Sequence, residues 1–437
     1  MHGSDMEFEE VLPLLSKYAG DGDPGAFSRR RFVQGALAVG AGLALPTLRP
    51  RDAAAAELAS PLRADEGVLV SVFLGGGNDG LNTLAPVSGG PRGQYEALRP
   101  GIAIPAASLL GVGGGWGLHP NLGKLHARYK RGRVALVQGT GMPSPDLSHF
   151  TATAKVMQGR VANQDGSGWL GRFVDGLPDG SSGMRAMTVG TSVPMSFVGQ
   201  QARTTSVPSD GQMWGADRSS PANALLYDAV SSFADGPSGL GPWGDRVSAT
   251  GRSALRDAAT LSRAFAQGAG PPSLAHDLLV AARLINLNLG TRVVGVTVGG
   301  FDTHTTQAGQ HEVLMQALDD AIEVFFANLA PSFQRRTTML VQSEFGRRPH
   351  SNGALGTDHG TAAPMIVVGE NVKGGTHAAA PDLGRLDDRG NLSPTVDFRA
   401  VYANLLSGWL RADDRQLLGG SFGGLGLFAA GPGQKRP

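Results

Sequence analysis

The chain has 437 residues, of which 38 are Lys or Arg and 37 are Asp or Glu, so its formal net charge is +1. This balance argues against a nucleic-acid-binding protein, which would carry a basic surplus on its binding face. Hydrophobic residues are 41% and charged residues 17% of the chain, a mixture typical of a folded globular protein. Cysteine is absent, which excludes disulfides, zinc–thiolate sites, iron–sulfur clusters and a cysteine nucleophile. Any metal must therefore be held by His, Asp, Glu, hydroxyl or carbonyl groups.

The N-terminal segment has the pattern of an export signal. Residues 28–33 read SRRRFV, and an apolar run of small residues follows from 35 to 48. Because a bilayer crossing needs about 20 apolar residues, this run is too short for a stable membrane span. We predict a twin-arginine signal peptide within residues 1–56, with the twin-arginine translocase as partner during export. The mature protein would then be periplasmic, cell-surface or secreted. The alternative is a buried helix that follows a chance arginine cluster.

Beyond residue 60 the pattern predicts one domain over residues 65–430. Short apolar runs alternate with amphipathic segments, which predicts a mostly parallel sheet with helices on both faces, an α/β fold. The dense Gly/Pro/Ser stretches at 89–116 and 235–272 are predicted to be surface excursions. The predicted strands are Val68–Leu74, Val134–Val137, Ala186–Val189, Val293–Val298, Thr338–Val341 and Met365–Val368. The predicted helices are Asn121–Arg131, Phe150–Gln158, Ala222–Phe233, Gly251–Gln267, Leu274–Leu287, His311–Leu329 and Asp397–Leu410.

Polar side chains follow two of these strands, where the sites of open α/β sheets form. Asp79 lies in a glycine-rich run directly after the first strand. It is either a functional carboxylate or part of an Asx turn. Asp302 and His304 follow the strand Val293–Val298. A hard oxygen and an imidazole in this arrangement are metal-ligand chemistry, whereas the competing interpretation makes Asp302 or Thr303 a helix cap.

Two further clusters lie near the predicted strand over 338–341. Glu344 follows this strand and is itself followed by Arg347, whose guanidinium is shaped to grip a phosphate or sulfate. The alternative is a surface salt bridge. Asp358 and His359 stand between glycines in a loop, which exposes a carboxylate and an imidazole side by side. The competing interpretation is a turn with an incidental histidine.

A fifth segment opens a predicted helix. Ser148 is by default the N-cap of this helix, as Asp146 also could be. In the catalytic interpretation Ser148 is a hydroxyl nucleophile, and the N-terminus of the helix favours a bound anion. His311 and His377 are left without a defined role.

These segments, taken together, resemble a known family. The chain is similar to the twin-arginine-exported domain-of-unknown-function family fifteen-oh-one, a branch of the alkaline-phosphatase-like, sulfatase-like superfamily. The matching motifs occur in the expected order over nearly all of the mature chain. They are FLGGGNDGLNT (73–83), LHPNL (118–122), SHF (148–150), GGFDTH (299–304), SEFGR (343–347), NGALGTDHG (352–360) and TVDFRAVYANLL (395–406).

The resemblance implies a three-layer α/β/α sandwich with one or two divalent metal ions (Zn, Mn, Mg or Ca) at the strand ends. It implies a hydroxyl nucleophile that attacks phosphorus or sulfur. Carried over by motif, the implied metal ligands are Asp79, Asp302, His304, Glu344, Asp358 and His359, and the implied catalytic residues are Ser148 and Arg347.

Two features depart from the superfamily pattern. The later ligand pair is Asp-x-His instead of Asp-x-x-x-His, and Glu344 ends the strand where an Asp-His pair is usual. Either Glu344 takes over a ligand position or the loop that carries Asp358 folds back. We therefore expect an exported, metal-dependent hydrolase of small-molecule or polymer phosphate or sulfate esters. The alternative is a noncatalytic exported protein of the same fold with a binding role.

Overall fold

The computed structural model describes residues 60–210 except 163, 164 and 191, residues 272–436, and scattered positions between 221 and 265. The chain forms two compact units, one of Met1–Ala55 with Met213–Ala259 and one of Ala56–Gln212 with Thr260–Pro437. The second unit holds the sheet and all of the clusters considered below. The predicted signal peptide lies outside the described residues, and the predicted domain boundaries stay a prediction.

The second unit is built on a mixed sheet of nine strands, in the order β11-β5-β10-β9-β1-β8-β6-β7, with β12 paired to β5. Every pair is parallel except those of β10, which runs antiparallel to β5 and β9. β1 is buried at all seven positions, because helices cover both faces of the sheet. The strands are β1 (Val68–Leu74), β5 (Val134–Gly141), β6 (Ala186–Val189), β7 (Thr204–Val207), β8 (Val293–Val298), β9 (Thr337–Gln342), β10 (Ala363–Gly369), β11 (Gly375–His377) and β12 (Val396–Asp397).

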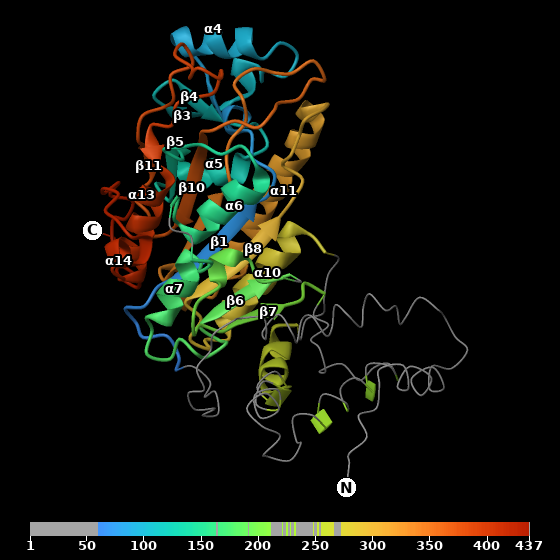
Figure 1. The fold of residues 1–437 in the computed structure, drawn as a ribbon, viewed down its shortest axis with the longest axis vertical. Helices are drawn as coiled ribbons and strands as arrows, with labels where there is room; N and C mark the ends of the chain where they lie inside the picture. Colours follow the sequence, from blue (N-terminus) through green and yellow to red (C-terminus); the bar gives the residue numbers. More distant parts are fainter. Residues whose placement is uncertain are drawn as a thin grey trace. The chain divides into compact units, whose positions relative to one another are not determined.

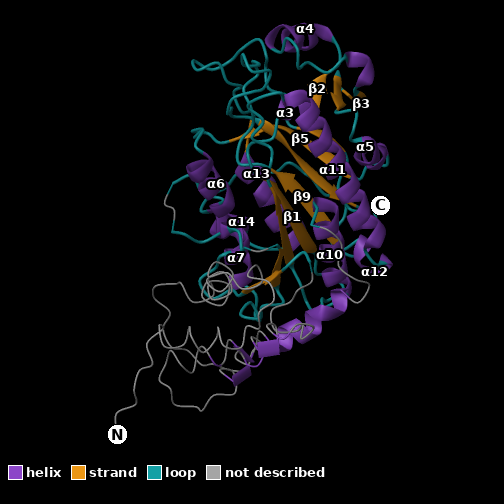
Figure 2. Ribbon diagram, turned by 90° about the vertical axis from the view of Figure 1, so that its right-hand side faces the viewer, coloured by secondary structure: helices purple, strands orange, loops and turns teal. Residues whose placement is uncertain are grey.

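Helices form one layer on each side of the sheet, which confirms the predicted three-layer α/β/α sandwich (Figures 1 and 2). One layer contains α5 (Gly123–Lys130), α10 (Leu274–Asn286), α11 (Gln307–Asn328) and α12 (Pro331–Gln334). The other contains α6 (His149–Gln158), α7 (Trp169–Asp175), α13 (Phe398–Ala403) and α14 (Asp414–Leu418). The core under the second layer is partly aromatic: Trp169 stacks on Tyr402 with 4.3 Å between ring centroids, and both are buried.

The stretch 89–116, predicted to be a surface excursion, has structure of its own. It contains α4 (Gly89–Leu98), a 3₁₀ turn η1 (Ala106–Ser108) and β3 (Leu110–Gly113). β2 (Leu84–Pro86) and β4 (Trp116–Leu118) join β3 in a small antiparallel sheet. Three consecutive glycines, 113–115, have positive φ and form the tight turn between β3 and β4, so the glycines mark a hairpin and not an open loop.

The six predicted strands all occur, at or within a few residues of their predicted bounds. α11 begins at Gln307, four residues before the predicted start, and α13 gives way to a π-helix, η4 (Asn404–Leu410). The helix predicted over 222–233 and the excursion at 235–272 fall largely outside the described residues. The helix predicted over 251–267 is helical at 251, 252 and 255–261 and continues as a 3₁₀ turn to residue 265. Short elements complete the unit: α3 (Gly80–Thr83), η2 (Met195–Phe197) and η3 (Ser262–Phe265). Among the described helices, none combines the length and apolar character that a bilayer crossing requires.

Candidate metal centre

Five strands bring their connecting loops to one edge of the sheet. β1, β5, β8 and β9 point the same way, so their carboxyl ends share this edge, and antiparallel β10 begins there. Asp302 and His304 follow β8, and Glu344 follows β9. His149 opens α6 after β5, and His359 lies in the loop that leads into β10. This shared edge is where side chains far apart in the sequence meet.

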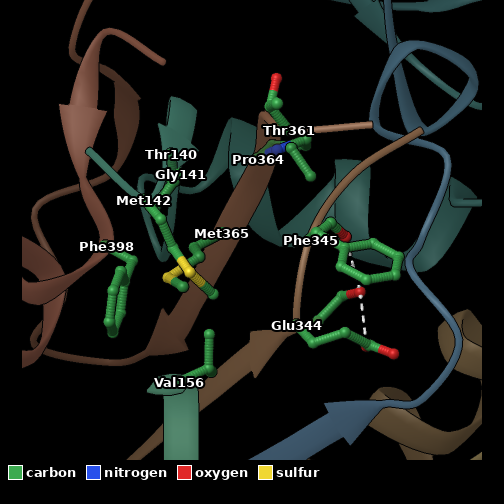
Figure 3. Close-up of a pocket in the computed structure, with 12 residues that line it drawn as sticks. Thr140, Gly141, Met142, Val156, Glu344, Phe345, Thr361, Pro364, Met365 and Phe398 are labelled. Carbon is green, nitrogen blue, oxygen red and sulfur yellow. Dashed lines mark hydrogen bonds between the residues drawn. The ribbon is translucent and has the colours of Figure 1, made fainter. Parts of the chain in front are cut away.

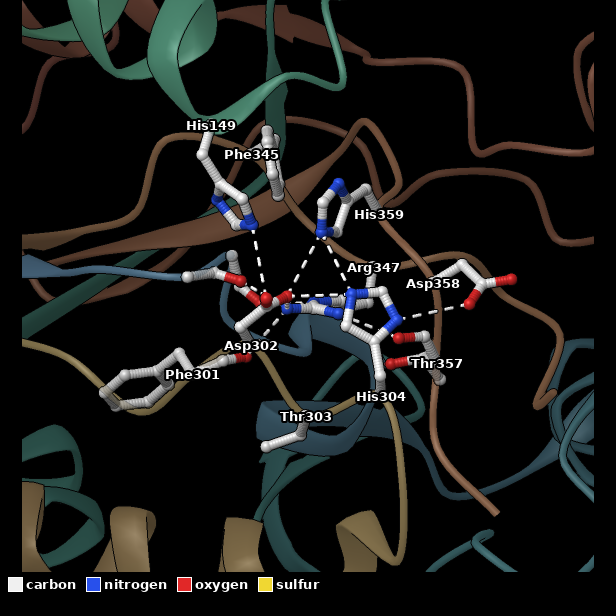
Figure 4. A network of polar contacts seen from close by, with 12 residues as sticks. His149, Phe301, Asp302, Thr303, His304, Phe345, Arg347, Thr357, Asp358 and His359 are labelled. Carbon is white, nitrogen blue, oxygen red and sulfur yellow. Dashed lines mark hydrogen bonds and ion pairs between the residues drawn. The ribbon is translucent and has the colours of Figure 1, made fainter. Parts of the chain in front are cut away.

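Three imidazole rings converge on the carboxylate of Asp302 (Figure 4). The Nε2 atoms of His304 and His359 lie 3.0 and 3.1 Å from its Oδ1, and 3.1 Å from each other. The Nε2 atom of His149 lies 3.4 Å from its Oδ2. One ligand atom from each of His149, Asp302 and His359 falls within 4.8 Å of the other two. These four side chains are called the Asp302 cluster below.

Each ring of the Asp302 cluster is held through its other nitrogen. Nδ1 of His149 lies 2.8 Å from Oε1 of Glu344, and Nδ1 of His359 lies 2.8 Å from the carbonyl oxygen of Leu147. Nδ1 of His304 lies 3.3 Å from Oδ1 of Asp358. Because these three partners are acceptors, each Nδ1 can donate its proton to one of them, which leaves the Nε2 lone pair of each ring available to a cation beside Asp302. Metal-binding histidines are oriented in this way.

The donor set fits a metal ion of the zinc type. Ligands about 2.0–2.2 Å from a tetrahedral ion stand about 3.3–3.6 Å apart, close to the separations within the Asp302 cluster. Nε2 of His149 is buried and has no hydrogen-bond partner, although burying an unpaired polar atom is costly. Two Nε2 lone pairs that face each other, on His304 and His359, are likewise unfavourable unless a proton or a cation lies between them. A divalent cation would satisfy all three rings.

The electrostatics of the site lower the pKa values of Asp302 and of the neighbouring Asp358. Burial raises the pKa of Asp302, but the hydrogen bond and charge of Arg347 outweigh burial and hold this pKa below its usual value. The hydrogen bond from Asn352 lowers the pKa of Asp358, and the smaller effect of burial opposes it. The side chain of Asp302 is 45% exposed, so its carboxylate is accessible to an ion from solvent.

Arg347 holds the cluster in place from the protein interior. This corrects its predicted role, which was to stabilise the charge of a phosphate or sulfate group during transfer. Its side chain is fully buried. Nε donates to the carbonyl of Gly77 at 2.7 Å, Nη1 to that of Thr357 at 2.8 Å, and Nη2 to that of Phe301 at 3.0 Å. Nη2 also donates to the carbonyl of Gly76 and to Oδ1 of Asp302. This guanidinium therefore ties three loops to the Asp302 carboxylate and is turned away from any substrate.

Glu344 and Asp358 lie behind the cluster. Each was expected to bind metal directly, but in the structure each accepts from the Nδ1 atom of a histidine in the cluster. Their environments differ, because the side chain of Glu344 is 2% exposed and that of Asp358 is 55% exposed. Asn352 holds Asp358 in place: its Nδ2 lies 2.9 Å from the carbonyl oxygen of His304 and 3.2 Å from Oδ1 of Asp358.

Asp79 stands apart from the cluster, contrary to the expectation that it binds metal. It caps α3, and its Oδ1 accepts from the backbone N–H groups of Leu81 and Asn82. Its Oδ2 accepts from Arg99 at 2.5 Å and from Gln307. Burial raises the pKa of Asp79, but the charge and hydrogen bond of Arg99 lower it further, so the net shift is downward. With both oxygens occupied and fully buried, this carboxylate stabilises the loop after β1.

His149 is the member of the cluster that the sequence reasoning missed. Its neighbour Ser148 was considered instead, as a hydroxyl nucleophile or as the N-cap of the helix. Ser148 is exposed at the N-cap of α6 and makes no side-chain capping bond, so its hydroxyl remains accessible beside the cluster. The signal was present in the SHF motif itself, where a histidine opens a helix beyond a strand end.

His311 and His377, the two histidines left without a defined role by the sequence, lie outside the Asp302 cluster. His311 is buried on α11, with its Nε2 3.2 Å from Oδ1 of Asn78. Burial is the main reason that the pKa of His311 is lowered to about 4. His377 lies on edge strand β11, with its Nε2 2.8 Å from the carbonyl oxygen of Lys373.

Close packing of the loops explains two of the glycines in the motifs. Gly76 has a φ of +119°, and a Cβ there would lie 2.4 Å from the backbone nitrogen of Asp302. A Cβ on Gly356 would lie 2.2 Å from the carbonyl carbon and oxygen of His304. The loops that carry Asp302 and His304 can approach their neighbours only where no side chain intervenes.

The fold and the Asp302 cluster define an α/β protein with a candidate metal centre at the carboxyl edge of a mostly parallel sheet. The chain belongs to the family described as "Protein of unknown function (DUF1501)", whose model matches residues 105–417. No curated protein matches the chain.

Three solved structures show a distant likeness to the chain, each with a TM-score below 0.4. A protein of the alkaline phosphatase superfamily from Vibrio parahaemolyticus is 10% identical with a TM-score of 0.37, over 87% of this chain and 75% of that one. The C-terminal periplasmic domain of EcEptC from Escherichia coli, in complex with Zn, is 9% identical with a TM-score of 0.34, over 75% and 77%. Alkaline phosphatase from the Antarctic bacterium TAB5 is 12% identical with a TM-score of 0.29, over 72% and 92%.

Proposed function

We propose that the protein is an exported, metal-dependent hydrolase of phosphate or sulfate esters. The observation that carries the proposal is the convergence of three Nδ1-anchored imidazoles on the carboxylate of Asp302. This nitrogen-rich set favours Zn²⁺ or another transition-metal dication over Mg²⁺ and Ca²⁺, which prefer oxygen ligands.

In this proposal the protein groups have separate tasks. His149, His304, His359 and Asp302 hold the ion, and Arg347 fixes the carboxylate of Asp302 in its orientation. When bound, a divalent ion at such a site polarises an ester oxygen and lowers the pKa of a nearby water or hydroxyl. Ser148, exposed at the start of α6, supplies the hydroxyl that attacks phosphorus or sulfur. The alcohol of the ester leaves with a proton, and water then cleaves the serine ester to release phosphate or sulfate and restore the hydroxyl.

The proposal is tested by assaying zinc-loaded protein on a panel of aryl phosphates and aryl sulfates. Asp302→Asn is the control, because it retains the size of the side chain and removes the charge on which the rings converge. We expect turnover by the wild type and none above background by the variant. Equal activity in both would place the reaction elsewhere.

The buried position of Arg347 favours a second candidate, a noncatalytic protein that binds a metal for recognition. The cation expected to stabilise a transferring group is fully buried and bonded to the protein, so it cannot serve a substrate. Tight metal binding without turnover on either class of ester supports this candidate.

The role of Ser148 has its own test, Ser148→Ala. Its hydroxyl makes no capping bond, so the variant should lose less than the typical 1 kcal/mol of an N-cap replacement. If Ser148 is the nucleophile, turnover disappears while the metal content and the melting temperature stay at wild-type values. Activity near the wild-type level would remove Ser148 from the mechanism.

Export has a separate test. The segment 28–33 reads SRRRFV, and twin-arginine signals require the arginine pair. Replacing Arg29 and Arg30 together by Lys should leave the precursor in the cytoplasm, as measured by cell fractionation and immunoblotting. Processed protein that still appears outside at the normal level would contradict this route.

A further inference from the structure

Glu344 is a buried carboxylate whose salt bridge, in the part of the chain that the structure describes, is with a histidine. Its side chain is 2% exposed, and its Oε1 lies 2.8 Å from Nδ1 of His149. The same oxygen accepts from the backbone N–H of Gly76 at 2.9 Å. Oε2 accepts from the hydroxyl of Ser343 at 3.3 Å. These neutral donors leave the charge of Glu344 to be balanced through the ring of His149.

The surroundings of Glu344 strengthen this interaction. Glu344 and Phe345 line a pocket whose other wall carries Met142, Met365 and Phe398 (Figure 3). Because the side chain of Glu344 is only 2% exposed, solvent screens its charge less than it would screen an exposed carboxylate. A buried carboxylate that lacked a positive partner would be strongly destabilising.

We propose that Glu344 is a positioning residue that orients the ring of His149 for metal binding. By accepting the Nδ1 proton it keeps the Nε2 lone pair of His149 available to an ion beside Asp302, and its buried negative charge adds to the attraction between the site and a dication. A dication bound to Nε2 completes the charge balance of the Glu344–His149 pair. This inference rests on the proposed metal centre and names the group that sets its affinity.

Asp358 provides a matched control. It holds His304 as Glu344 holds His149, through Nδ1, but its side chain is 55% exposed and the contact is 3.3 Å long. Solvent therefore screens its charge. If charge acting through the ring sets the affinity, removing the charge of Glu344 must weaken metal binding more than removing that of Asp358.

The experiment compares wild type, Glu344→Gln and Asp358→Asn in the full chain. Zn²⁺ affinity is measured by competition with a chromophoric chelator, and the visible spectrum of the Co²⁺-loaded protein reports the ligand field. We expect Glu344→Gln to bind Zn²⁺ about 10–100-fold more weakly and to shift the Co²⁺ bands. We expect Asp358→Asn to lose less than about tenfold. Melting temperatures of the metal-free proteins control for folding.

The outcomes separate this inference from the proposed function. A wild type that binds no Zn²⁺ overturns both. A wild type that binds Zn²⁺, with unchanged affinity and Co²⁺ spectrum in Glu344→Gln, overturns only the role of Glu344. If Glu344→Gln does not fold, the inference is still tested by an NMR measurement of the His149 tautomer in the wild type. Long-range ¹H–¹⁵N spectra of the metal-free protein, assigned with His149→Gln, should show the Nδ1–H tautomer for His149, and an Nε2–H tautomer overturns the inference.

Discussion

Replacing Arg347 by Lys is expected to abolish metal binding and to lower the free energy of unfolding by about 1–3 kcal/mol for each buried carbonyl that loses its donor. The guanidinium donates to four backbone carbonyls in three loops and to Asp302, a set that a single ammonium group cannot reach at once. Without it, buried carbonyls lose their partners and the carboxylate of Asp302 loses its fixed orientation. Urea unfolding and the metal content of the folded fraction measure the two effects.

Arg348→Lys is the matched control for this variant. Arg348 is the next residue along the chain and is partly exposed. Lysine keeps its charge, so the stability and the metal content should stay close to the wild-type values. A stable Arg347→Lys variant that binds metal normally would show that this guanidinium does not organise the centre.

Replacing Asp79 by Asn is the second change with a large expected effect. The substitution leaves the guanidinium of Arg99 buried without its countercharge, because both side chains of this ion pair are fully buried. Breaking a buried pair from one side costs about 3–5 kcal/mol. We therefore expect a marked fall in the melting temperature, while the molecules that remain folded bind metal with wild-type affinity.

Asp302→Asn should give the opposite pattern. Its side chain is 45% exposed, so solvent can approach the charge of Arg347 and the loss of stability should be smaller than in Asp79→Asn, whereas the metal affinity should fall sharply. Calorimetric unfolding and metal titration of the two variants side by side distinguish the roles of Asp79 and Asp302. Loss of metal in Asp79→Asn without loss of stability would restore Asp79 as a ligand.

The sheet was predictable because its strands are buried on both faces. Runs such as Val68–Leu74 and Val293–Val298 are almost continuously apolar, and they stand between segments with helical periodicity. Strand order was not predictable, because it depends on contacts between segments hundreds of residues apart. The antiparallel direction of β10 also leaves no trace in its own sequence, although it brings the loop with Asp358 and His359 back to the shared edge.

The candidate site was predictable in part, for physical reasons that differ from residue to residue. Asp302 and His304 are separated by one residue in the loop after β8, so their side chains can reach the same place. Sequence gives the type of a charged group but not the direction in which it points. Glu344 was therefore expected to bind metal and Arg347 to face a substrate, with a surface salt bridge as the alternative, whereas both side chains are buried and bonded to the protein. His149 escaped notice because a serine beside it offered a simpler chemical role.

The central claim is that the Asp302 cluster binds one transition-metal dication. The most direct measurement is elemental analysis of wild-type protein purified without a histidine tag, followed by Zn²⁺ titration of the metal-stripped protein. The account predicts about one equivalent of tightly held dication, with Zn²⁺ bound far more tightly than Mg²⁺ or Ca²⁺. A well-folded wild type that is purified without metal and takes up no Zn²⁺ on titration would contradict it.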